Sequence, residues 1–301
     1  MATTITCQEL NKRLAGGDSL FVIDVLPSEE YATRHLPGAF NACVYEMVFQ
    51  SNIAKLAPDH AVTLVLYDDS GTTMAATTAR EKLLSAGYMD VRVLTGGLAA
   101  WAAAGYPVEL VKPLPLRPVL KDGIYRLDPS ASVLEWIGRN INNRHYGRIP
   151  IKSGEVVISN GELSLGEITL EMSGISNLDL QDEDYRQMLV NHLKSDDFFA
   201  IDRYPVASIV MRSWQPIVGA TPGTPDHNVQ GELTIKGVTR PLTFQVSLAL
   251  QEDGTLKAQA AFDIDRTAWN ITYGSGRLFE KLGMHLVHDR IDIEFFIIAR
   301  R

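Results

Sequence analysis

Apolar residues up to about position 110 gather in short runs that alternate with stretches of helical character. Thr6 and Glu9 form a capping box, which predicts a helix that ends near Gly16. Short unbroken apolar runs are typical of strands buried on both faces of a parallel sheet. The runs are Leu20–Val25, Val62–Tyr67 and Val91–Leu94, with further helices expected over Met74–Ala86 and Leu98–Ala104. This order predicts an α/β domain whose parallel sheet carries helices on both faces.

From about Gly123 the pattern changes to strict alternation of apolar and polar residues. That period of two predicts antiparallel strands, joined by hairpins at Asn160-Gly161 and Asp253-Gly254. The alternating segments are Val156–Ile158, Leu163–Leu165, Leu242–Gln251, Leu256–Ile264 and Ile291–Ile297. One helix, expected at Asp182–Lys194, interrupts them. About eight strands in all are enough to close a β-barrel that could hold one small ligand.

A proline-rich segment separates these two patterns. Residues 112–118 hold three prolines in seven positions, which blocks both helix and strand ladder. We therefore expect three parts: an α/β domain at 1–111, a linker at 112–121 and a barrel domain at 122–301.

Composition narrows the class of protein. The 36 acidic and 28 basic residues give a formal net charge of −8, which argues against a nucleic-acid partner. No apolar run is long enough for a transmembrane helix, and the first residues do not resemble a signal peptide. Cys7 and Cys43 are too few for a thiolate metal cage, and we expect them to be reduced. These features predict a cytoplasmic location, with neither metal nor cofactor.

Two spaced motifs in the first half resemble rhodanese-like domains. The first motif comprises Val22–Val25, Glu30-Tyr31 and His35–Asn41, and the second comprises Gly96–Trp101 and Gly105–Val108. The resemblance implies a sulfur-carrying cysteine at the end of the central strand, on a loop that leads into a helix. Asp68 stands at that position, and the basic residue expected near Thr72-Thr73 is absent.

Asp68 changes the expected chemistry of this loop. A carboxylate cannot form a persulfide, and it would place a permanent anion where the N–H groups of the loop favour one. The site would then be filled by its own side chain, which predicts a catalytically silent loop over Asp68, Asp69, Ser70, Gly71, Thr72 and Thr73. Cys7 and Cys43 lie off this loop and are better interpreted as small semi-buried residues. Residual sulfur transfer and an Asp68-dependent hydrolysis stay open as enzymatic alternatives.

The second half resembles the YceI-like family of lipocalin-like, isoprenoid-binding barrels. The motifs are Tyr125–Ser132, Asn191–Phe199 with Tyr204-Pro205, Gly231–Pro241 and Asp265-Arg266; Ala200 departs from the family, where an acidic residue is common. The resemblance implies an elongated apolar cavity for a polyprenyl or quinone-like lipid. Candidate ligand-binding residues are Trp136, Arg139, Arg144, His145, Arg186, His192, Phe198, Phe199 and Trp269.

Two further groups of polar residues are weaker candidates. His285 and His288 are three apart, and in a strand that spacing puts them on opposite faces. Asp179 with Asp182–Asp184 is acidic, but it lacks the ligand spacing of a calcium loop and is better interpreted as a helix start.

The sequence therefore predicts a binding protein. Its barrel would hold an apolar isoprenoid-type lipid, and its first domain would serve as a docking or anion-sensing module with a protein partner. A barrel filled by its own side chains, in a purely structural protein, stays open, as does a homodimer.

Overall fold

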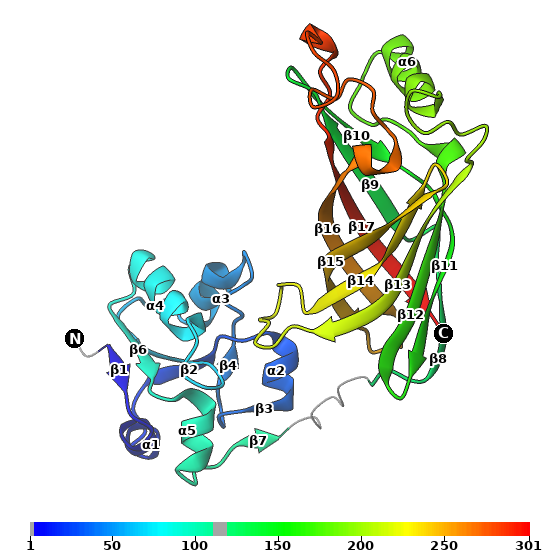
Figure 1. Cartoon of the computed structure of the whole chain (residues 1–301). Helices are drawn as coiled ribbons and strands as arrows, with labels where there is room; N and C mark the ends of the chain where they lie inside the picture. The colour runs from blue at the N-terminus through cyan, green and yellow to red at the C-terminus, as the bar shows by residue number, and fades with distance from the viewer. Residues whose placement is uncertain (1–2, 111–118) are drawn as a thin grey trace. The chain divides into compact units, whose positions relative to one another are not determined.

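The computed structural model describes residues 3–110 and 119–301, which fall into two compact units (Figure 1). The expected linker, residues 112–121, lies largely outside the described residues. No helix in the described ranges has the length and apolar character needed to cross a bilayer.

The N-terminal unit is built on a parallel five-stranded sheet in the order β1-β6-β5-β2-β4. Its strands are β1 (Thr4–Ile5), β2 (Leu20–Asp24), β4 (Phe40–Asn41), β5 (Thr63–Tyr67) and β6 (Asp90–Leu94), and β3 (Arg34–His35) pairs with β7 (Glu109–Leu110) apart from them. Its helices are α1 (Cys7–Ala15), α2 (Ser28–Thr33), α3 (Phe49–Leu56), α4 (Ala75–Ser85) and α5 (Gly97–Ala103). The three predicted strands and three predicted helices are confirmed to within two residues.

Alternate side chains of β5 explain why both faces of this sheet are covered. Leu64 and Leu66 pack into a core with residues of α3 and α4. Val65 and Tyr67 point the other way, into a core with residues of α1 and α5. Because successive side chains of a strand alternate, one apolar run builds both layers.

The C-terminal unit contains one antiparallel sheet of ten strands in its described residues. They are β8 (Gly123–Leu127), β9 (Val133–Arg139), β10 (Arg144–Arg148), β11 (Ile151–Ser159), β12 (Glu162–Glu171), β13 (Val206–Pro216), β14 (His227–Ile235), β15 (Val238–Leu250), β16 (Leu256–Asp265) and β17 (Arg290–Arg300). The helix α6 (Glu183–Lys194) lies between β12 and β13, as predicted, and its N-cap is Asp182.

β17 closes the barrel. It pairs with β8 through Ala299 and Arg300, which joins the ends of an eight-strand ring that runs through β11 to β16. The other part of β17 pairs with β9, and β10 extends from β9. The predicted closed antiparallel barrel is therefore confirmed, with two strands beyond the eight of the ring.

The alternation predicted from sequence sets the barrel interior. On β15, Leu242, Phe244 and Val246 are buried, whereas Thr243 and Gln245 are exposed. The predicted hairpin turn between β11 and β12 is present, and both of its central residues, Asn160 and Gly161, have positive φ. His285 does not lie in a strand: residues 283–285 form a 3₁₀ turn before β17.

Candidate functional site: the Asp68 loop and the barrel cavity

The loop after β5 wraps around the side chain of Asp68. Asp68 is 1% exposed, its Oδ1 accepts the Gly71 N–H at 2.6 Å, and its Oδ2 accepts the Thr73 hydroxyl at 2.8 Å. The carboxylate therefore occupies the interior of the loop, as the sequence predicts, and takes up hydrogen bonds that the loop could offer to an anion.

Two glycines let α5 approach this loop closely. The Leu98 N–H donates to the Asp68 carbonyl at 2.9 Å, and the Ala99 N–H donates to the Asp69 carbonyl at 2.7 Å. Gly97 has a φ of +59°, and a Cβ there would lie 2.3 Å from the Asp68 carbonyl oxygen. Only glycine fits that position, so the Gly96-Gly97 pair fixes the loop against the first turn of α5.

A second buried carboxylate lies beside Asp68. Asp24, at the end of β2, is 2% exposed and its Oδ1 accepts the Leu26 N–H at 2.9 Å. Burial raises the pKa of Asp24 to about 6; the bond to the Leu26 N–H, the Tyr67 hydroxyl and His35 oppose that rise, and the charge of Asp68 adds to it. Burial also raises the pKa of the Tyr67 hydroxyl, which accepts the Leu36 N–H at 3.1 Å.

The remaining polar groups of this site are engaged with the protein itself. Arg34 forms an ion pair with Asp69, and the Ser70 and Thr72 hydroxyls lie 2.7 Å apart. Cys43 is buried, and Cys7 lies on α1 with its thiol 3.8 Å from the Thr95 carbonyl. Neither thiol lies on the loop that follows β5.

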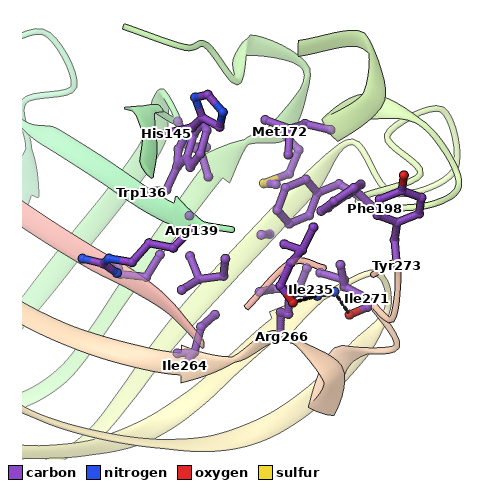
Figure 2. A pocket seen from close by; sticks show the side chains of 18 of the residues that line it. Trp136, Arg139, His145, Met172, Phe198, Ile235, Ile264, Arg266, Ile271 and Tyr273 are labelled. Atoms are coloured by element: carbon purple, nitrogen blue, oxygen red, sulfur yellow. Dashed lines mark hydrogen bonds between the residues drawn. The ribbon is translucent and has the colours of Figure 1, made fainter. Parts of the chain in front are cut away.

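The barrel contains an apolar cavity of about 290 Å³ (Figure 2). Its wall is formed mostly by aliphatic and aromatic side chains of the strands and of α6. Besides the predicted residues discussed below, the lining includes Met172, Leu193, Ala207, Arg266, Ile271 and Tyr273. The size is near the lower end of about 300–1,000 Å³ for small-molecule sites.

Six of the nine predicted ligand-binding residues line this cavity. They are Trp136, Arg139, His145, His192, Phe198 and Phe199. Trp136 and Phe198 present apolar surface to it (Figure 2), and the Trp136 indole N–H donates to the Ser176 carbonyl at 3.1 Å. The alternation of β9 places Trp136 inward, because it shares a face with the buried Leu134.

The basic members of this set each lie beside a carboxylate. Arg139 lies 2.6 Å from Asp292, and His192 lies 3.3 Å from Asp197. His145 Nδ1 lies 2.8 Å from Asp179. Burial raises the pKa of Asp179, but hydrogen bonds from the Tyr146 N–H, His145 and Asn177 outweigh it and hold that pKa below its usual range.

Three predicted residues do not line the cavity. Arg144 is exposed and lies over the Tyr146 ring. Arg186 donates to the Leu180 carbonyl and pairs with Glu183 on α6. Trp269 is buried in the barrel core, where its indole N–H donates to the Leu233 carbonyl at 2.9 Å. Sequence patterning cannot separate an aromatic residue in the packed core from one in a cavity wall.

Arg266 is a cavity residue that was not among the predicted site residues. It lines the cavity at 2% exposure, and its guanidinium donates to the carbonyls of Ile271 (2.7 Å), His288 (2.9 Å) and Val287 (3.1 Å). Burial lowers the pKa of Arg266, and Asp289 and Asp265 oppose that shift. Its place in the Asp265-Arg266 motif was the available signal.

In the first of the two weaker groups, His285 lines the cavity, whereas the backbone N–H of His288 donates to the Arg139 carbonyl at 2.9 Å. Asp182 caps α6 by accepting the N–H groups of Asp184 and Tyr185, as expected of a helix start. Within residues 3–110 and 119–301, no group of three or more His, Cys, Asp or Glu side chains could hold a metal ion.

The fold and its cavity define the C-terminal unit as a closed antiparallel barrel with an apolar interior, preceded by an α/β domain. The chain belongs to the YceI-like family, because the model of that family matches residues 125–299, more than half of the chain. A rhodanese-like domain matches residues 6–104.

Each of the similar proteins covers only part of this chain. An HTH-type transcriptional regulator of Mycobacterium tuberculosis is 33% identical over 105 residues, 35% of this chain, which spans only 44% of that protein. BcnA of Burkholderia cenocepacia is 24% identical, with 57% of this chain and 99% of that chain covered and a TM-score of 0.46. A polyisoprenoid binding domain from Saccharophagus degradans is 14% identical, with 60% and 99% covered and a TM-score of 0.43.

Proposed function

We propose that the barrel binds an apolar isoprenoid-type lipid, polyprenyl or quinone-like, and that the rhodanese-like domain is a catalytically silent docking or anion-sensing module. The observation that carries the lipid proposal is the apolar cavity inside the barrel, in which the two arginines at the wall, Arg139 and Arg266, are engaged with other protein groups. Each CH₂ group buried from water contributes about 0.8 kcal/mol, so an apolar chain gains affinity without needing a free charge in the wall.

Native mass spectrometry of the full chain, followed by solvent extraction, tests this proposal. We expect an adduct of prenyl mass on the wild-type protein, or on protein incubated with prenyl alcohols. Ala207→Phe adds a phenyl ring at a buried position in the cavity wall and should abolish the adduct. Ala249→Phe, at an exposed position on β15, is the matched control and should retain it. Wild-type protein that takes up no prenyl compound even when supplied with one contradicts the proposal.

The silence of the rhodanese-like domain is proposed from the hydrogen bonds that Asp68 makes inside its own loop. Both carboxylate oxygens accept hydrogen bonds and the side chain is 1% exposed, which also leaves little access for a substrate of an Asp68-dependent hydrolase. The loop would then offer a protein partner its outer surface, on which Arg34 and Asp69 pair.

Sulfur transfer from thiosulfate to cyanide tests this second part. The wild-type chain should form no thiocyanate. In Asp68→Cys, the new thiolate can attack the outer sulfur of thiosulfate, form a persulfide and release sulfite, because the Gly71 N–H is available to stabilise the anion. Mass spectrometry detects that persulfide, and Asp68→Ser serves as the control without a thiolate. Thiocyanate formation by the wild-type protein would show that the domain transfers sulfur and would contradict this part of the proposal.

A further inference from the structure

Large apolar side chains with high exposure gather at one end of the barrel domain. Among its described residues, eight such side chains are at least half exposed, and Val119 and Val218 are two of them. The other six lie on three segments that we call the rim: residues 140–144, 182–188 and 277–284. They are Ile141 (67%), Tyr185 (63%), Met188 (63%), Leu278 (51%), Phe279 (50%) and Met284 (80%). Exposed apolar groups clustered in this way mark an interaction surface.

The three rim segments meet where the cavity is lined. The β9–β10 hairpin lines it through Asn140, α6 through Leu189, and the segment before β17 through Met284. Asn140 also forms a bridge with Val287, and the His192 and Tyr273 rings pack 4.6 Å apart. Figure 1 shows the hairpin, α6 and the segment before β17 at the same end of the barrel.

Met284 connects the outer surface to the interior, because it is 80% exposed and also lines the cavity. Apolar surface is therefore continuous from solvent into the barrel. An apolar ligand that leaves the cavity at this end would have apolar contacts along its path, which suits exchange with a hydrocarbon phase rather than with water.

The charges of the rim cancel. Its three segments carry four acidic and four basic side chains, with Asp182, Glu183, Asp184 and Glu280 against Arg144, Arg186, Arg277 and Lys281. A surface without net charge gains little from anionic headgroups, so attraction to a surface must come from burial of the apolar side chains.

We propose that the rim inserts into the interfacial layer of a lipid bilayer and holds the cavity mouth against it, so that an apolar ligand passes between membrane and barrel. The identity of that ligand rests on the function proposed above, but docking itself does not. The partner is an uncharged or zwitterionic lipid surface, and the contact is made by six apolar side chains flanked by balanced charges.

Co-flotation of the full chain with pure phosphatidylcholine vesicles tests docking. The wild-type chain should float with the vesicles at both low and high salt. The double variant Met188→Gln/Phe279→Gln changes two rim residues that do not line the cavity, and its partition coefficient should fall on the order of a hundredfold, roughly tenfold for each side chain. Val218→Gln, at an equally apolar and fully exposed position outside the rim, should not change it.

A second readout separates docking from ligand binding. A short prenyl alcohol dissolved in buffer should bind the double variant and the wild type equally, measured by tryptophan fluorescence, because Trp136 lines the cavity. Flotation without prenyl binding would overturn the proposed function and leave docking intact. Prenyl binding without flotation would overturn docking. A dimer in sedimentation velocity that the double variant abolishes, with no flotation, would also overturn it, since the rim would then be a contact between copies.

Discussion

Two buried carboxylates, Asp24 and Asp68, lie at the carboxyl edge of the N-terminal sheet, and hydrogen bonds compensate their burial to different extents. Asp68 accepts a backbone N–H and a hydroxyl within one loop. Asp24 keeps a hydrogen bond to the Leu26 N–H, but its pKa still rises to about 6. The sequence revealed the carboxylate at 68 because its motif fixes the position. The bond to Thr73 depends on side-chain rotamers that no pattern encodes.

The stability of the N-terminal domain should fall between about pH 4 and pH 6 because of Asp24. Its pKa in the folded chain, about 6, exceeds the ordinary value of 3.8, so the folded state holds the proton more tightly. The contribution of Asp24 is therefore complete below pH 4 and is lost as the pH rises through 6. Asp24→Asn should remove this dependence. Relative to the wild type, the free energy of unfolding of the variant should therefore rise by up to roughly 3 kcal/mol between pH 4 and pH values above 6.

Hydrogen exchange of β2 and β5 across this pH range measures that effect. Asp59→Asn is the matched control, because Asp59 is exposed and its Oδ1 also accepts the N–H two residues further on, at 2.9 Å. A variant that tracks the wild-type pH profile throughout would show that Asp24 does not carry the dependence.

At the scale of elements, periodicity located β11, β12, β15, β16 and β17 and the helices α1, α4, α5 and α6, but it did not locate β13 or β14. It missed α2 and α3, and it missed β1, β3, β4 and β7, which have two residues each. Two residues contain no period, so only their neighbours in the fold define them as strands. His285 belongs to a three-residue 3₁₀ turn before β17, which the spacing of a histidine pair cannot indicate.

A substitution at Gly97 tests how closely α5 packs against the loop that contains Asp68. Gly97→Ala should lower the free energy of unfolding by at least about 3 kcal/mol, since it adds a strained positive φ and a Cβ that would lie 2.3 Å from the Asp68 carbonyl. Gly105→Ala, which has a φ of +79° and no atom within 4 Å of the added Cβ, should cost only about 1–2 kcal/mol. Urea unfolding compares the two variants. Equal losses of unfolding free energy would mean that a small structural shift removes the close contact between the Gly97 position and the Asp68 carbonyl.

At the scale of the whole molecule, the barrel is predictable from sequence but its unfilled interior is not. Alternation shows which side chains point inward, whereas the volume left between them depends on the shear and on how ten strands and α6 come together. That is why Phe198 and Trp269 looked equivalent in the sequence, although the first lines the cavity and the second packs in the core.

A ligand that fills this cavity should stabilise the barrel by mass action. At a prenyl alcohol concentration of 100 times Kd, the gain is about 2.7 kcal/mol. We expect slower hydrogen exchange in β9 and β13, which contribute Trp136 and Ala207 to the wall. Ala207→Phe should show no such gain. A wild-type barrel whose exchange is unchanged at saturating ligand would contradict occupancy of the interior.

The closure of the barrel through β17 also constrains the order of events during synthesis. Asp128, just after β8, and Arg300, at the end of β17, form an ion pair between residues 172 positions apart in the chain. The ring cannot close until residue 300 has left the ribosome, whereas every strand of the N-terminal sheet precedes residue 95. The nascent chain can therefore complete its first domain while the barrel strands still have an unpaired edge, and the barrel interior is not enclosed until that edge is paired.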